Sequence, residues 1–221
     1  MNFLNHIKLG IKIYAVILFN LFSNFLQLLF IDGHMILGCS NLTGRFWIGS
    51  LWYYRDPNEA PSVEKSLTGV DFDNGLVDGF FIDNKNLVVA LDNGGIETVR
   101  LSFSDENTEA NSFFYLERSR SVQEHDDLIT GLVATPDKLI TASYDRSFVQ
   151  LEKDTLKLIA RLDNAHSDLI TNLTVNSKNF DMICTSSNDG TVSLWDLRQC
   201  GTTNTSQSCK FKLFDVFHFR Y

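Results

Sequence analysis

A repeated motif in the second half of the chain constrains the fold more than any other feature of the sequence. The nine residues HDDLITGLV, which begin at His125, recur 41 residues later as HSDLITNLT from His166. The six residues ITASYD, from Ile140, recur 44 residues later as CTSSND from Cys184. A weaker copy starts at Val77. A period of about 40 residues indicates a fold made of repeated supersecondary units, each of which covers the apolar surface of its neighbour.

Each unit has the pattern of short strands separated by turns. In the last unit, residues 182–187 and 191–196 flank the tripeptide Asn188-Asp189-Gly190, whose residue types favour a β-hairpin turn. No segment between residues 33 and 199 has a helical period. The sequence therefore predicts an all-β fold.

The last unit resembles a blade of the WD-repeat family, a four-stranded antiparallel sheet of a β-propeller. The stretch NDGTVSLWD, preceded by a histidine, carries this resemblance. In that family a His, a Ser or Thr, an Asp and a Trp form one hydrogen-bonded set that fixes the blade. The residues that match this set are His166, Thr185 or Ser187, Asp189 and Trp195, with Ser187 taken as the hydroxyl member.

The two preceding units match the set only in part. His125 and Asp145 are present in the first of them, but Leu151 stands where the tryptophan is expected. In the unit before that one, Asp92 remains and the histidine is missing. A buried His and Asp satisfy one another's hydrogen-bonding groups, so we expect these residues to act in structure rather than in catalysis.

A second and closer resemblance lies in residues 35–61. The run GRFWIGSLW and the spacing of DP and AP that follows are not general WD-repeat features, and they are similar to the methylosome family of WD-repeat proteins. This resemblance begins at about Asp32 and fades after Arg198. It implies a seven-bladed propeller, of which this chain would encode about three and a half blades. These blades are expected at residues 32–56, with two strands, 76–118, 125–161 and 166–198.

The resemblance also implies a function. Members of that family are non-catalytic adaptors of the type II protein arginine methyltransferase, in the cytoplasm and nucleus, and help present histone and Sm-protein substrates for symmetric dimethylation. Arg45 and Trp47 match the residues that face the methyltransferase, so we expect them to bind this partner. Because only about half of the ring is encoded, we expect a truncated piece that is unstable or prone to aggregate when it is expressed alone.

The charge distribution agrees with an arginine-rich partner and argues against direct nucleic-acid binding. The whole chain has a net charge of −8. The two ends hold five basic and two acidic residues, so residues 33–199 carry 14 basic against 25 acidic residues. Such a surface attracts basic peptides and repels phosphates. Acidity that serves only solubility remains an alternative.

The two ends differ in composition from the middle. Residues 1–32 and 200–221 hold nine of the eighteen phenylalanines. Residues 13–31 are apolar apart from Asn20, Ser23, Asn24 and Gln27. Three interpretations stay open: translated non-coding sequence, a signal anchor, or a buried or amphipathic segment. We therefore divide the chain into an apolar leader (1–31), a partial propeller (32–199) and an atypical tail (200–221), in which residues 209–214 could form the missing outer strand.

The leader also supports an alternative function, that of a membrane-anchored or secreted propeller that serves as a general interaction scaffold. Enzymatic alternatives are weak, because adjacent residues such as His166, Ser167 and Asp168 point to opposite faces of a strand and cannot converge. The four cysteines lack the close pairing of a zinc site. The sequence predicts no catalytic, cofactor-binding or metal-binding residues.

Overall fold

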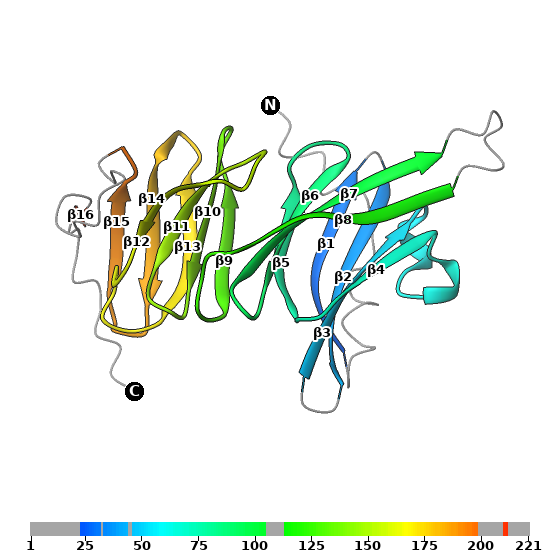
Figure 1. Ribbon diagram of the computed structural model, residues 1–221, viewed down its shortest axis with the longest axis horizontal. Coiled ribbons are helices and arrows are strands. Elements are labelled where there is room, and N and C mark those ends of the chain that lie inside the picture. Colours follow the sequence, from blue (N-terminus) through cyan, green and yellow to red (C-terminus); the bar gives the residue numbers. More distant parts are fainter. Residues whose placement is uncertain (1–22, 32, 44–45, 105–112, 199–209, 212–221) are drawn as a thin grey trace.

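The computed structural model describes residues 23–31, 33–43, 46–104, 113–198 and 210–211, and it consists of four antiparallel sheets (Figure 1). Each sheet has four strands, and its strands follow one another in chain order. The first sheet contains β1 (Ser23–Ile31), β2 (His34–Thr43), β3 (Phe46–Tyr54) and β4 (Thr68–Phe72). The second contains β5 (Leu76–Phe81), β6 (Asn86–Leu91), β7 (Gly95–Ser104) and β8 (Phe113–Gln123).

The third and fourth sheets hold the two strong sequence repeats. The third contains β9 (Ile129–Ala134), β10 (Lys138–Ser143), β11 (Phe148–Glu152) and β12 (Leu158–Leu162). The fourth contains β13 (Ile170–Asn176), β14 (Asn179–Ser187), β15 (Val192–Asp196) and β16 (Lys210–Phe211). The first strands lie side by side, β1 against β5, β5 against β9 and β9 against β13. This arrangement is that of consecutive propeller blades, so the predicted all-β, partial WD-repeat propeller is confirmed. We refer to the four sheets as blades 1 to 4.

Blade 1 is more complete than the sequence predicted. Residues 32–56 were expected to supply two strands, and they form β2 and β3. Two further strands flank this pair, β1 on the inner side and β4 on the outer side. β1 comprises residues 23–31, the last nine of the expected leader, and it pairs antiparallel with β2 from Ser23 opposite Asn41 to Ile31 opposite His34. The expected boundary at residue 32 therefore falls between two paired strands, and residues 1–22 lie outside the described part.

The outer strand of blade 4 lies where the tail was expected to supply it. β16 pairs with β15, with Phe211 opposite Leu194 and Lys210 opposite Trp195. The remainder of the tail, residues 199–209 and 212–221, is outside the described part. Among the described residues, no helix is long and apolar enough to cross a membrane.

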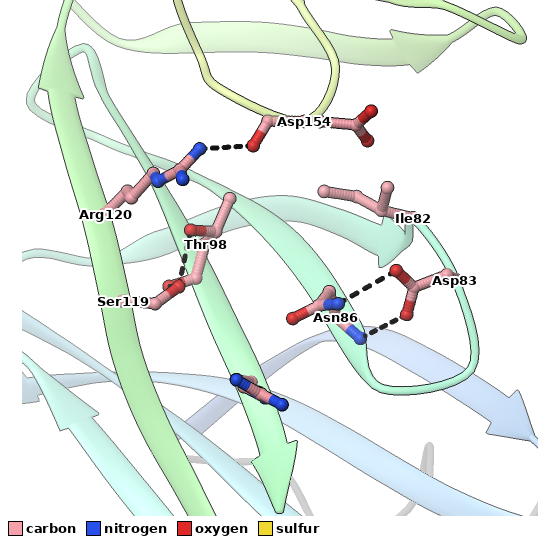
Figure 2. A pocket seen from close by; sticks show the side chains of 8 residues that line it. Ile82, Asp83, Asn86, Thr98, Ser119, Arg120 and Asp154 are labelled. Carbon is pink, nitrogen blue, oxygen red and sulfur yellow. Dashed lines mark hydrogen bonds between the residues drawn. The ribbon is translucent and has the colours of Figure 1, made fainter.

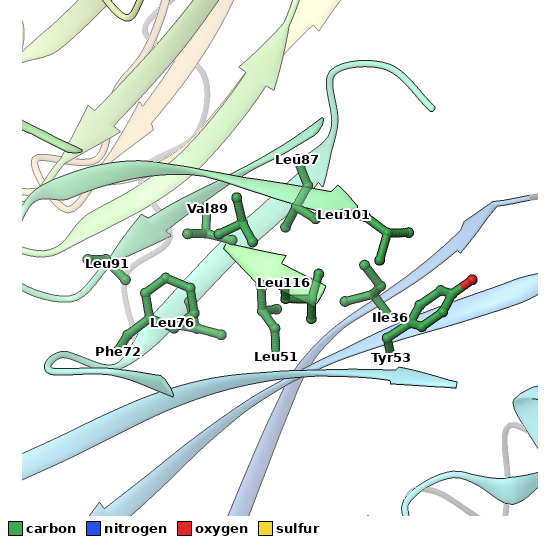
Figure 3. Packing of buried hydrophobic residues seen from close by; sticks show 11 residues of the cluster. Ile36, Leu51, Tyr53, Phe72, Leu76, Leu87, Val89, Leu91, Leu101 and Leu116 are labelled. Atoms are coloured by element: carbon green, nitrogen blue, oxygen red, sulfur yellow. The ribbon is translucent and has the colours of Figure 1, made fainter. Parts of the chain in front are cut away.

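Both faces of blades 2 and 3 are covered by apolar contacts with neighbouring blades, and this explains the burial pattern along their strands. The second strands β6 and β10 are buried along almost their whole length. The sequence of a strand buried on both faces is a continuous apolar run, rather than an alternation of apolar and polar residues. The core between blades 1 and 2 joins Ile36 and Leu51 to Val89 and Leu101 (Figure 3). Separate cores lie between blades 2 and 3 and between blades 3 and 4.

An ion pair reinforces the outer edge of the junction between blades 1 and 2. The guanidinium of Arg118 on β8 donates two hydrogen bonds to the buried carboxylate of Glu97 on β7, at 2.7 and 2.8 Å. The same guanidinium lies 5.3 Å from the ring centre of Phe72 on β4 and 3.6 Å from the carboxylate of Asp73. Arg118 therefore neutralises a buried charge in blade 2 and packs on blade 1.

Removing this guanidinium tests its contribution to stability. We expect Arg118→Ala to lower the free energy of unfolding by about 2 kcal/mol, because the Glu97 carboxylate then stays buried without its partner. Adding Glu97→Gln to that variant should restore part of the loss, since the amide carries no charge. The measurement is urea unfolding followed by circular dichroism. Lys65→Ala, which removes an exposed pair with Glu59, is the control and should change the midpoint little. Equal losses for both single variants would contradict the proposed role of Arg118.

Candidate functional site

Blade 4 contains a complete chain of side-chain hydrogen bonds. Nδ1 of His166 lies 3.2 Å from Oδ2 of Asp189, and Nε2 lies 2.7 Å from Oγ1 of Thr185. The indole N–H of Trp195 donates to the same Thr185 oxygen at 2.8 Å. The Thr185 hydroxyl accepts from the indole and donates its own proton to Nε2 of His166. The N–H of the imidazole is therefore on Nδ1 and faces the Asp189 carboxylate. The chain links β14, β15 and the segment before β13.

Thr185, rather than Ser187, is the hydroxyl residue of this chain. The Ser187 side chain lies two residues further along β14, where it donates to the carbonyl of Asp168 at 3.0 Å and accepts from the N–H of Asp189 at 3.1 Å. Ser187 therefore holds the turn that presents Asp189, and it does not contact the imidazole. Residues i and i+2 share a face of a strand, so the sequence could not separate these two candidates.

The indole of Trp195 also connects blade 4 to blade 3. It is 1% exposed, and its ring centre lies 5.2 Å from that of Phe148 on β11. Such tilted aromatic contacts add to the free energy gained by burial. The hydrogen-bonded chain therefore fixes the orientation of a side chain that packs between two blades.

Blade 3 retains the polar part of the set. Nδ1 of His125 lies 2.9 Å from Oδ2 of Asp145, and Nε2 lies 2.9 Å from Oγ1 of Thr141. Ser147 adds a third contact, because its hydroxyl donates to Asp145 at 2.6 Å. Leu151, at the tryptophan position, is fully buried in the core between blades 2 and 3. The network is thus complete without an indole.

These contacts shift the acidity of both carboxyl groups. Burial disfavours the charge of Asp145, yet the hydrogen bonds from His125 and Ser147 outweigh burial and hold the pKa of this carboxyl well below its ordinary value. At Asp189 burial is likewise outweighed, by hydrogen bonds from Thr191 and from the N–H of Ser167, and the pKa is again well below its ordinary value. Both carboxylates are therefore ionised, hydrogen-bonded structural groups.

In blade 2 the corresponding positions are mainly apolar. The turn after β6 matches the later turns through its hydrogen bonds: the N–H of Gly95 donates to the side chain of Asn93, as that of Thr191 donates to Asp189. Asn93, and not Asp92, therefore occupies the aspartate position. The same alignment places Phe72 at the histidine position, Val89 at the threonine position and Val99 at the tryptophan position, and all three are buried in the core shared with blade 1.

The two histidines have no free ring nitrogen for acid or base chemistry. Each nitrogen of His125 and His166 is within hydrogen-bonding distance of a side chain of its own blade, and both rings are buried. Ser167 donates to Asp189, and the carboxylate of Asp168 accepts from the N–H of Leu169, so these neighbours do not converge on a common point. Within the described ranges, no group of three or more His, Cys, Asp or Glu side chains is arranged to hold a metal ion.

Of the two predicted partner-binding residues, Trp47 lies near the tip of the β2–β3 hairpin. Arg45 is outside the described residues. Trp47 is the second residue of β3, and its side chain is 39% exposed. It borders a hollow of about 310 Å³ whose wall and floor come from blades 1, 2 and 3. The residues that line this hollow are Ser40, Trp47, Gly75, Leu76, Val77, Asp92 and Leu128.

One carboxyl group, that of Asp92, lies in this mostly apolar hollow. Burial raises the pKa of Asp92, although the backbone N–H groups of Gly75 and of Asp92 itself favour the charged form. A side chain at residue 75 would clash with this carboxylate, because a Cβ built there would lie 2.7 Å from Oδ2. Gly75 thus lets the carboxylate reach the hollow. A tryptophan face beside a carboxylate can receive a cationic or aromatic group of a partner.

The sequence motif predicted a binding role for Trp47 and gave no such role to Asp92, which lines the same hollow. Asp92 looked like a remnant of the hydrogen-bonded set, whereas Asn93 fills that position. The only sequence signal was the Gly-Gly pair that follows, which sets the register of the turn in blade 2. The approach of Trp47 to Asp92 depends on how blades 1 and 2 pack, and no local pattern reports that contact.

Comparison with known proteins agrees with the resemblance found in the motifs. No protein-family model matches the chain. The chain is similar to the Methylosome protein WDR77 of Xenopus laevis, with 28% identity over 169 residues, which is 76% of this chain and 48% of the relative. The chain thus spans about half the length of the curated relative it matches. The predicted resemblance to the methylosome family of WD-repeat proteins is confirmed.

The role of Thr185 leads to a stability prediction. We expect Thr185→Val to lower the free energy of unfolding by about 2 kcal/mol, because Nε2 of His166 and the indole N–H of Trp195 both lose a buried partner. Thr171→Val is a matched control, since it removes the same hydroxyl from an exposed position on β13. Chemical denaturation of the three proteins gives the comparison. A loss at Thr171 as large as that at Thr185 would show that the network is not the cause.

The depressed acidity of Asp145 predicts a pH dependence of stability. A carboxyl whose pKa is lower in the folded than in the unfolded chain stabilises the fold above the unfolded value of about 4, and this contribution disappears as the pH falls below it. Thermal melting between pH 6 and pH 3 should therefore show a smaller acid-induced loss in Asp145→Asn than in the unmodified chain. Asp126→Asn, at an exposed neighbouring carboxyl, should keep the original pH profile.

Proposed function

We propose that the chain is a non-catalytic adaptor of the methylosome type, which binds a type II protein arginine methyltransferase and helps present arginine-rich histone and Sm-protein substrates for symmetric dimethylation. Such a role would be carried out in the cytoplasm and nucleus. The chain is similar to a methylosome protein, and the proposal assigns to this chain the corresponding partner and substrates.

The observation that carries the proposal is the exposure of Trp47. A tryptophan is usually largely buried, and an exposed one beside a hollow is typical of an interface hot spot. Trp47 lies within the stretch GRFWIGSLW, which carries the closer family resemblance. Its position on the rim between blades 1 and 2 leaves the indole accessible to a partner, while Asp92 supplies an acceptor beside it.

The acidic character of the propeller supports the substrate part of the proposal. Residues 33–199 carry 25 acidic residues against 14 basic ones. Histone tails and Sm-protein tails that receive methyl groups are rich in arginine, and electrostatic attraction raises the local concentration of such segments and their rate of association. The two imidazoles are fully used in structural hydrogen bonds, so the site supports binding rather than a chemical step.

A binding experiment tests this proposal directly. Purified type II arginine methyltransferase is titrated against the chain by biolayer interferometry, with Trp47→Ala as the test variant. We expect at least a tenfold loss of affinity, which corresponds to about 1.4 kcal/mol. Phe180→Ala is the matched control, because Phe180 is 44% exposed on blade 4 and should not affect binding. Unchanged affinity in Trp47→Ala, with circular dichroism showing an intact fold, would refute the assigned interface.

A further inference from the structure

A second hollow lies on a different part of the molecule, between blades 2 and 3. It has a volume of about 380 Å³ (Figure 2). The β5–β6 turn and the strands β7 and β8 of blade 2 form most of its wall, and the β11–β12 turn of blade 3 closes one side. The lining residues are Ile82, Asp83, Asn86, Thr98, Arg100, Ser119, Arg120 and Asp154. None of them belongs to the surface around Trp47.

A β-bulge directs one arginine into this hollow. Val99 pairs with Arg118 and Thr98 pairs with Arg120, so Ser119 is the extra residue of β8. Residues opposite one another in an antiparallel pair point to the same face, and without the bulge two arginines at i and i+2 would share a face. The bulge sends Arg118 toward blade 1 with Val99 and sends Arg120 toward blade 3 with Thr98.

The two arginines of the hollow differ in what they contact. Arg120 donates from Nη1 to the backbone carbonyl of Asp154, and this contact bridges blades 2 and 3. Arg100 lies on the same face of β7 as Thr98 and is exposed. Its guanidinium makes no hydrogen bond or ion pair with the described residues. The hollow therefore contains one unpaired guanidinium and one with spare N–H groups, in a chain whose surface is mostly acidic.

The carboxylates near the hollow do not neutralise these arginines. The oxygens of Asp83 accept from the backbone N–H groups of Lys85 and Asn86 and from the Asn86 side chain. The carboxylate of Asp154 points away from Arg120 (Figure 2). Glu117 stands opposite Arg100 in the strand register, but no ion pair within 4 Å joins the two side chains in the described part of the chain. Both guanidinium groups thus keep donors for an external acceptor.

We propose that this hollow binds a peptide-borne oxyanion, the phosphoryl group of a phosphoserine or the carboxylate of a glutamate, through Arg100 and Arg120. Planar guanidinium groups offer paired N–H donors that match the oxygens of carboxylate and phosphate. The hydroxyls of Thr98 and Ser119, 2.8 Å apart, form the polar wall between the two arginines. This site is independent of the surface around Trp47.

A neighbouring aromatic surface favours a peptide over a free anion. Beyond Arg100 and its opposite residue Glu117, the same face of the β7–β8 hairpin carries Tyr115 opposite Ser102 and Phe113 opposite Ser104. Tyr115 is 47% exposed and Phe113 is 59% exposed. An extended segment anchored at Arg100 by its oxyanion could place its following apolar side chains on these two rings. A free phosphate would use only the arginines.

The test is isothermal titration calorimetry of the full chain with four probes. Three are pentapeptides of the form Ala-Ala-X-Leu-Ala, blocked at both ends, in which X is phosphoserine, glutamate or serine, and the fourth is inorganic phosphate. We expect saturable binding of the phosphoserine or glutamate peptide, and Arg100→Gln should weaken it at least tenfold. Arg100 is the preferred target because its guanidinium makes no internal contact. Arg120→Lys is a second variant that keeps the charge but loses the planar donor pair.

Controls separate the proposed site from general charge attraction. Arg146→Gln removes an exposed charge from the β10–β11 turn and should leave the affinity unchanged. The anionic peptide that binds more tightly identifies whether the oxyanion is a phosphoryl group or a carboxylate. Equal binding of the serine peptide, equal weakening by Arg146→Gln, or no saturable binding of either anionic peptide would overturn the proposal. Phosphate binding as tight as that of both peptides would refute the peptide component. The Trp47→Ala result has no bearing on any of these outcomes.

Discussion

The structure depends on the mutual burial of neighbouring blades. Each of the sheets β5–β8 and β9–β12 is apolar on both faces, so neither face can be left to water. Burying such faces stabilises the fold by roughly 25 cal/mol per Å² of apolar surface, while a lone four-stranded sheet would leave both exposed. The position of every functional side chain follows from how adjacent blades meet. Both hollows described above lie at such junctions.

The blades reach the same geometry by different physical means. Blade 4 uses a hydrogen-bonded chain from Asp189 through His166 and Thr185 to Trp195, and blade 3 keeps the polar half of that chain. Blade 2 replaces it with apolar side chains that enlarge the core shared with blade 1. A buried polar network stabilises only when all its members are satisfied, so replacing most of it by packed apolar groups is a consistent alternative.

The sequence predicted the parts of the structure that local patterns encode. The 40-residue period, the turn tripeptide Asn188-Asp189-Gly190 and the histidines led to the propeller fold and to most of the hydrogen-bonded set in blade 4. Thr185 and Ser187 could not be distinguished, because both lie on one face of β14. β1 was hidden within the apolar leader, since an apolar strand and a poor membrane segment can have the same composition over nine residues.

The remaining features depend on contacts between blades, which have no local signature. The bulge at Ser119 separates the directions of Arg118 and Arg120, although the two residues look equivalent in the sequence. The apolar residues that occupy the hydrogen-bonding positions in blade 2 also act over a long range. Phe72 fills the histidine position, so blade 2 is stabilised by the apolar core that it shares with blade 1 rather than by a polar network. The same junction supports Trp47 and Asp92. The surface proposed to contact a partner is thus tied to the same core that joins the first two blades.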